Sequence, residues 1–122
     1  MRETISVLIT GVGGDLGQAI VKALRLSTKS IRCHGCDIGD SGVGIAFVDT
    51  FHKVPRVDEA SYVEALDRLC RSLPTHAVIP GSEPEIYFLS QLGNPPKLPS
   101  GIPIVCQEKH WLETYGDKLA CL

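Results

Sequence analysis

Blocks of hydrophobic residues alternate with polar segments along the chain, and their spacing predicts alternating strands and helices. The β-branched run 5–9 predicts a buried strand, and apolar residues at helical spacing from Asp15 onward predict a helix. A second strand is expected over 31–36 and ends at Asp37. The apolar residues 46–48 predict a short third strand.

The second half of the chain continues this alternation. Residues 61–73 carry an apolar stripe at helical spacing and precede Pro74, which cannot continue a helix. Ser61 and Glu64 have the spacing of a capping box, with Asp58 as an alternative cap. The other predicted elements are a strand at 76–80, a helix that begins at Ser82, a proline-rich loop at 93–103, a strand at 104–106 and helical segments over 108–122.

This order of elements predicts an α/β fold. Strands that alternate with helices of about ten to fifteen residues form parallel sheets that helices cover. We therefore expect a Rossmann-like open parallel sheet with helices on both faces. The chain shows no internal repeat and no low-complexity tract, so the pattern predicts a single domain of this kind.

Charge and hydropathy exclude several classes of partner. The net charge is −2 and 21% of the residues are charged, so no bulk charge attracts nucleic acid or an anionic membrane. No apolar run approaches the ~18–20 residues that cross a bilayer. The chain has 5 cysteines and lacks the apolar core of a secretion signal at its N-terminus, which favours reduced thiols and a cytoplasmic location.

Two of the cysteines, Cys33 and Cys36, form a Cys-x-x-Cys pair around His34. A structural zinc site needs about four ligands, and the sequence holds no second pair of this kind. Side chains alternate between the two faces of a strand, so these cysteines are expected to point in opposite directions. The sequence thus predicts buried free thiols and no metal site.

A glycine-rich turn follows the first predicted strand, in the segment ITGVGGDLGQAI, 9–20. The dinucleotide fingerprint Gly-x-Gly-x-x-Gly does not fit, because its third glycine would fall on Leu16. The spacing that fits is Gly11-x-x-Gly14-x-x-Gly17. In such a turn the first glycine allows the tight bend, the middle one lets the backbone approach an anion, and the last lets helix and sheet pack closely.

One interpretation of this turn is an NAD(P)-binding module of the short-chain dehydrogenase or epimerase type. Asp37 ends the second predicted strand, where an acidic residue accepts a ribose hydroxyl in dinucleotide-binding folds. The other interpretation is that the glycines serve turn geometry alone. The dehydrogenase interpretation is weakened because no Tyr-x-x-x-Lys motif is present and the chain is short for a substrate domain.

Four segments, in order along the chain, resemble a known family. They are VLITGVGGDLGQAIVKALR (7–25), VPRVDEASYVEALDRLC (54–70), AVIPGSEPEI (77–86) and YGDKLACL (115–122). Together they look like the N-terminal, pre-ATP-grasp domain of ATP-grasp enzymes, and most closely like the carbamoyl-phosphate synthase large chain. The resemblance covers nearly the whole chain.

The resemblance implies an ATP-dependent ligase that joins a carboxylate to an amine or a similar nucleophile. In such enzymes ATP and Mg²⁺ lie between two further domains, while the first domain forms one wall of the substrate cleft and contacts the acceptor substrate. We expect a pre-ATP-grasp domain over 1–115 and the start of the ATP-grasp region at 116–122. A chain without the ATP- and metal-binding domains is expected to be an inactive fragment, with no catalytic residue and no tightly bound cofactor of its own.

The resemblance also indicates which residues face the substrate. Glu83 and Glu85 are candidates to hold a substrate amine or to orient a nucleophile, and Glu85 is also the capping-box partner of Ser82. Lys118 matches a lysine that reaches ATP phosphates in the parent enzyme. Such ligases are often homodimers, and no patch in this sequence demands one. The predicted cleft-lining residues are Gly11, Gly13, Gly14, Asp15, Gly81, Ser82, Glu83 and Glu85.

Overall fold

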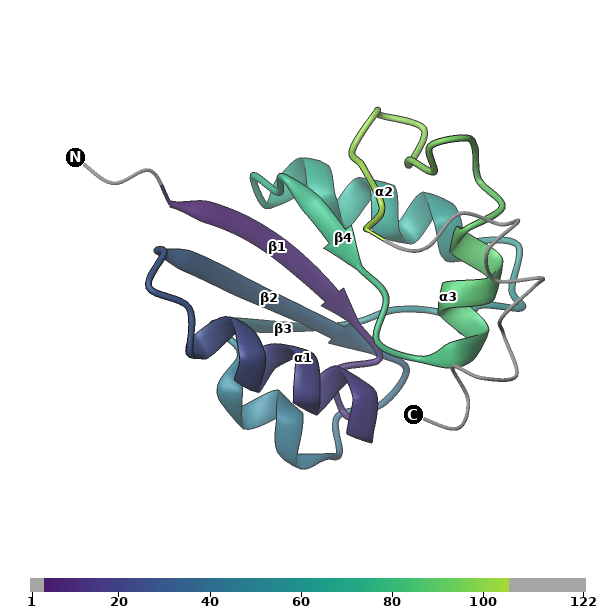
Figure 1. Cartoon of the computed structure of the whole chain (residues 1–122). Helices are drawn as coiled ribbons and strands as arrows, with labels where there is room; N and C mark the ends of the chain where they lie inside the picture. Colours follow the sequence, from purple (N-terminus) through teal and green to yellow (C-terminus); the bar gives the residue numbers. More distant parts are fainter. Residues whose placement is uncertain (1–3, 106–122) are drawn as a thin grey trace.

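The computed structural model describes residues 4–105, which form a four-stranded parallel sheet in the order β3-β2-β1-β4 (Figure 1). β1 lies between β2 and β4, and its Leu8 lies opposite His34 of β2 and Val78 of β4. Parallel pairing directs the carboxyl ends of all the strands to one edge of the sheet. The strands are β1 (Ile5–Thr10), β2 (Ile31–Asp37), β3 (Thr50–Lys53) and β4 (Ala77–Ile79).

Helices cover both faces of this sheet, as the sequence predicts. Figure 1 shows α1 and the short 3-10 helix η1 on one face, with α2 and α3 on the other. Each helix joins two strands or follows one, so the α/β Rossmann-like fold class is confirmed. The helices are α1 (Asp15–Arg25), η1 (Val43–Phe47), α2 (Tyr62–Ser72) and α3 (Glu83–Leu89).

Two hydrophobic clusters hold the layers together, one on each face of the sheet. On the first face Val7, Ile9 and Cys33 pack against Val21 of α1. The second cluster joins the strands to α2, α3 and the loop that follows them, and its buried members are Leu8, Cys36, Tyr62, Leu66, Cys70, Val78, Leu89, Leu98 and Ile104. The alternation of side chains along β1 and β2 explains why neighbouring residues belong to different clusters.

The prediction of buried free thiols that point to opposite faces of the sheet is confirmed for Cys33 and Cys36. Cys33 and Cys36 belong to opposite clusters, and both are buried free thiols, as is Cys70. Burial raises the pKa of the Cys36 thiol well above its ordinary value and raises the pKa of Cys70 to about 11. These thiols therefore stay protonated and behave as small apolar side chains.

The predicted third strand at 46–48 is wrong. Residues Val43–Phe47 form η1, and the strand β3 begins later, at Thr50. The Arg25 side chain holds this turn in place, because its Nε and Nη2 donate to the Phe47 carbonyl oxygen over 3.1 and 2.7 Å. Arg25 also pairs with Asp49 at 3.2 Å. Short-range propensity cannot reveal an anchor that comes from a helix 22 residues away in sequence.

The capping predictions and the last strand also need correction. Ser61 precedes α2, but its side chain makes no capping hydrogen bond. Ser82 likewise makes no bond to a backbone N–H of α3, and instead donates to the side chain of Glu85. The predicted strand at 104–106 is reduced to one isolated parallel bridge between Ile104 and Val78. The helical segments predicted over 108–122 lie outside the described residues.

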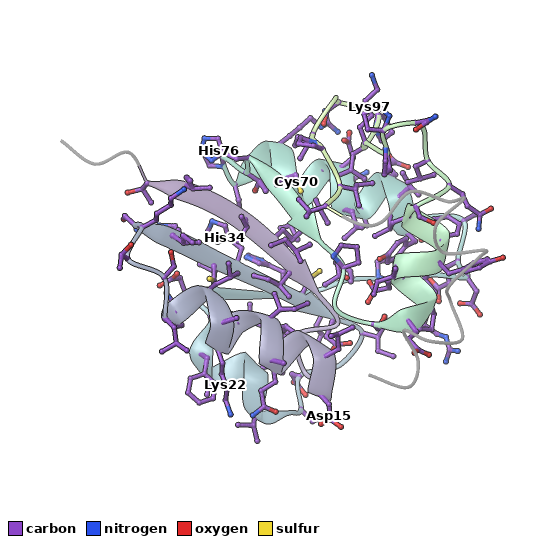
Figure 2. The ribbon with its side chains drawn as sticks, viewed as in Figure 1. Asp15, Lys22, His34, Cys70, His76 and Lys97 are labelled. Atoms are coloured by element: carbon purple, nitrogen blue, oxygen red, sulfur yellow. The ribbon has the colours of Figure 1, made fainter. Side chains whose placement is uncertain are left out.

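A pair of histidines shares one hydroxyl group on the α2 side of the sheet. His34 Nδ1 lies 2.7 Å from Thr50 Oγ1, and His52 Nε2 lies 3.0 Å from the same oxygen. His34 is buried within the sheet, as Figure 2 shows. Burial, Arg32 and the His52 imidazole lower the pKa of His34, while Asp49 acts against them.

We expect the free energy of unfolding to fall as the pH drops below about 6.5, the pKa of an unperturbed histidine. Because the pKa of His34 is lowered in the folded chain, the unfolded chain takes up a proton first, and acid then favours unfolding. Urea denaturation between about pH 8 and pH 5 measures this slope. His34→Gln should flatten it, and equal slopes for the two proteins would contradict the prediction.

Candidate functional site

The carboxyl ends of the strands open into a cleft of about 670 Å³. Its walls come from segments that are far apart in sequence: the glycine turn with the start of α1, the end of β2, residues 54–58, and residues 81–85. Ligands of open α/β sheets bind outside the carboxyl ends of the strands. The position of the cleft is therefore the one that this fold offers for a ligand.

The glycine turn uses its own amide groups inside the protein. The Val12 N–H donates to the Cys36 carbonyl oxygen at 3.2 Å, and the Gly14 N–H donates to the Gly11 carbonyl oxygen at 3.1 Å. The Gly13 N–H donates to the Asp37 carboxylate at 2.9 Å. A phosphate group would have to break these hydrogen bonds to gain the same donors, so the geometry does not favour the anion-binding role expected for the turn.

Asp37 braces the turn from the end of β2. Its Oδ2 accepts from the Gly13 N–H, and its Oδ1 accepts from its neighbour, the Ile38 N–H, at 2.8 Å. Both carboxylate oxygens therefore have backbone partners. The NAD(P)-binding alternative needs this carboxylate for a ribose hydroxyl, and the structure gives it a different role.

The floor of the cleft is made of closely packed main chain. A Cβ atom built at Gly17 would lie 2.3 Å from the Gly11 carbonyl oxygen, and one built at Gly81 would lie 2.2 Å from the Thr10 carbonyl oxygen. Real Cβ atoms do not approach this closely. The glycines at these positions let the turn after β1, the start of α1 and the loop after β4 meet directly.

Glu85 lies beside this floor, with both carboxylate oxygens in hydrogen bonds. Ser82 Oγ donates to Oε1 at 2.7 Å, and the buried Tyr62 hydroxyl of α2 donates to Oε2. Burial and the neighbouring carboxylate raise the pKa of the Tyr62 phenol, so it remains a donor. Thr10 Oγ1 accepts from the Gly81 N–H at 3.2 Å beside them.

The structure brings together most, not all, of the residues that the sequence predicts for this site. Gly11, Gly14 and Asp15 line the cleft, as do Gly81, Ser82 and Glu85. Asp15 lies at the first turn of α1, at the lower edge in Figure 2. Gly13 and Glu83 are not among the lining residues, because the Gly13 amide is turned to Asp37 and Glu83 is exposed on α3. Lys118 lies outside the described residues.

Sequence reasoning missed one wall of the cleft, the segment Val54–Asp58. Val54, Pro55 and Val57 are half-buried there and give this wall an apolar surface. Arg56 and Asp58 are exposed and pair at 3.4 Å. The useful signal was the position of this segment directly after β3, at the carboxyl edge of the sheet.

The charge of the cleft is predominantly negative. Asp15, Asp37, Asp58 and Glu85 line it, and Arg56 is the one basic residue among its lining residues. Residues 4–105 contain no group of three or more His, Cys, Asp or Glu side chains that could hold a metal ion. Over the same residues, no helix is long and apolar enough to cross a membrane.

Comparison with solved structures confirms the fold. The chain is similar to the complete multifunctional pyruvate carboxylase from Rhizobium etli, with a TM-score of 0.60 and 14% identity over 98% of this chain and 12% of that chain. It is also similar to dTDP-glucose 4,6-dehydratase from Bacillus anthracis str. Ames in complex with NAD, with a TM-score of 0.48 and 18% identity over 70% of this chain and 29% of that one. The second likeness is too partial to bear on function.

Sequence comparison identifies the family. No curated protein matches the chain. The family model described as PylC-like, N-terminal domain matches residues 7–104, which is nearly all of the described structure. This span contains the glycine turn, the sheet, the apolar wall and the Ser82–Glu85 pair, so the match and the cleft concern the same part of the molecule. The chain belongs to the PylC-like N-terminal domain family, the pre-grasp domain of ATP-grasp ligases.

Proposed function

We propose that this domain forms one wall of the substrate cleft in a longer ATP-grasp ligase, and that the cleft holds an amine-bearing acceptor substrate. The observation that carries this proposal is the charge of the cleft, because four acidic residues and one arginine are among its lining residues. Opposite charge favours a cationic ligand, and the apolar wall at 54–57 suits an aliphatic chain beside it. The amine would be joined to a carboxylate that ATP activates.

ATP and Mg²⁺ belong to the parent enzyme of this family, and the glycine turn and Asp37 are poorly suited to hold them. The amides of the glycine turn are used internally, and the carboxylate of Asp37 is bound to backbone N–H groups. We therefore propose that ATP and Mg²⁺ bind outside residues 4–105, with the ATP-grasp region beginning at 116–122. Lys118 in that segment is proposed to reach the ATP phosphates.

A cytoplasmic location is part of the same proposal. The free, buried thiols of Cys33, Cys36 and Cys70 suit a reducing compartment. A small-molecule substrate is the expected partner, and the homodimer expected from the resemblance stays a prediction. Size-exclusion chromatography measures whether the chain forms a homodimer.

Titration of the ¹⁵N-labelled chain tests the cleft. We expect n-butylammonium to shift the amide signals of Gly14, Gly81 and Ser82 with a dissociation constant on the order of millimolar, because a ligand with so few atoms gains little energy. Butyrate, which has a similar length and the opposite charge, should leave these signals unchanged. The measurement is the chemical-shift change of each amide as a function of probe concentration.

The same titration distinguishes the alternative function. NAD is the probe for the dinucleotide-binding interpretation, and the proposal expects it to leave the glycine turn unperturbed. Shifts at Gly11 and Gly14 with NAD, together with none for n-butylammonium, would overturn the proposed function. As a matched control, Glu64→Gln on the exposed face of α2 removes a carboxylate far from the cleft lining and should not alter amine binding.

A further inference from the structure

The Ser82–Glu85 pair determines which kind of group the cleft can bind, an inference that rests on the proposed function. Ser82 is one of the residues that line the cleft, and its hydroxyl donates to Glu85 Oε1 at 2.7 Å. A hydroxyl has one hydrogen atom and two lone pairs. Because the hydrogen is directed to Glu85, only the lone pairs of Ser82 are available to a ligand.

Glu85 is held so that it keeps Ser82 in this orientation. The Tyr62 hydroxyl donates to Glu85 Oε2, and Tyr62 is only 1% exposed. The Tyr62 ring packs edge-on against Phe88, with ring centroids 5.9 Å apart, which fixes the phenol in the core. Glu85 itself is 9% exposed, and the Gly11 main chain lies against its Oε1. Both oxygens of the carboxylate thus have a hydrogen-bond partner inside the protein, which fixes the orientation of the carboxylate.

We infer that Ser82 is a hydrogen-bond acceptor for the ligand, that Glu85 is a positioning residue rather than a direct ligand, and that the cleft therefore selects groups that carry an N–H or O–H. A primary or secondary ammonium group fulfils both requirements of the cleft, positive charge and a hydrogen to donate. A quaternary ammonium group fulfils only the first. A carboxylate or carbonyl group fulfils neither.

Two cationic probes separate hydrogen bonding from charge. n-Butylammonium carries three N–H donors, whereas n-butyltrimethylammonium carries the same charge and none. We expect the first to bind about tenfold more tightly, because a hydrogen bond from a charged donor is worth about one order of magnitude in affinity. The quantity to follow is the ratio of the two dissociation constants, measured by NMR titration of the chain and of each variant.

Three variants test the assignment through this ratio. Ser82→Ala removes the acceptor, and the preference for the donor probe should fall to about one. Ser82→Thr keeps the hydroxyl on an extended backbone that suits a β-branched residue, so the preference should be retained. Glu85→Met removes the carboxylate that orients Ser82 but leaves the lone pairs of the hydroxyl, so it should lower the preference to a value between those of the parent chain and of Ser82→Ala. The double variant should match Ser82→Ala, since both residues act through one hydroxyl.

Each outcome has a definite meaning. A preference that survives in Ser82→Ala, or a further loss in the double variant, would show that Glu85 contacts the ligand directly and would overturn this inference while leaving the proposed function intact. Absence of binding by both probes would overturn the proposed function and the role of Ser82 with it. Glu83→Gln, which removes an exposed carboxylate of the same helix outside the cleft lining, should leave the ratio unchanged.

Discussion

Gly17→Ala is expected to lower the free energy of unfolding by about 2 kcal/mol or more. The added Cβ would lie 2.3 Å from the Gly11 carbonyl oxygen and 2.7 Å from the Val12 Cα, and both are main-chain atoms that cannot rotate away. Overpacking of this kind costs about 1–3 kcal/mol and sometimes more. Alanine regains up to about 1 kcal/mol from its higher helix propensity, so the steric cost prevails.

Urea denaturation followed by circular dichroism measures this loss. Gly39→Ala is the matched control, because no heavy atom lies within 4 Å of a Cβ built at that position. Its free energy of unfolding should stay within about 0.5 kcal/mol of the parent chain. Equal stability of Gly17→Ala and Gly39→Ala would show that the turn and α1 are not in the close contact described above.

Tyr62→Phe is expected to lower the free energy of unfolding by about 2 kcal/mol. The substitution keeps the ring and its contact with Phe88 but removes the hydroxyl that donates to Glu85 Oε2. The carboxylate oxygen then loses its partner in a site where Glu85 is 9% exposed. An unsatisfied buried charge costs more than the bond itself contributes, which is why one oxygen atom has so large an effect.

Thermal and urea denaturation of Tyr62→Phe give the measurement, with Tyr87→Phe as the control. Tyr87 is 58% exposed on α3, so loss of its hydroxyl should change stability by less than about 0.5 kcal/mol. If the two variants are equally stable, the Tyr62 hydroxyl does not stabilise the Glu85 carboxylate. That result would also argue against Glu85 as a residue held in place to position Ser82.

The strands and helices with strong periodicity could be predicted from the sequence. β1, β2, α1 and α2 each differ by only a residue or so from their predicted bounds, because their apolar spacing matches the burial that the sheet imposes. β3 could not be predicted in this way. Its position depends on Arg25, whose contacts with Phe47 and Asp49 hold the preceding segment as a turn.

The candidate site could be predicted in part. Loops that follow parallel strands meet at one edge, and this rule places the glycine turn beside Ser82 without any structure. This rule does not predict which hydrogen-bond partner each side chain has. Ser82 and Glu85 have the spacing of a capping box, but their hydrogen bond joins side chain to side chain. The Glu85 carboxylate also accepts a hydrogen bond from Tyr62, which belongs to another helix. Asp37 likewise finds the Gly13 amide.

New ligand preferences can arise in this domain without rebuilding its scaffold. The floor of the cleft is main chain, where the turn at Gly11 and the loop at Gly81 meet α1 through backbone atoms, so its shape depends little on which side chains surround it. The segment Val54–Asp58 forms a separate wall of the cleft. Evolution or protein engineering can therefore vary the side chains and the charge of that wall, and with them the ligand that the proposed site accepts, while the floor of the cleft stays constant.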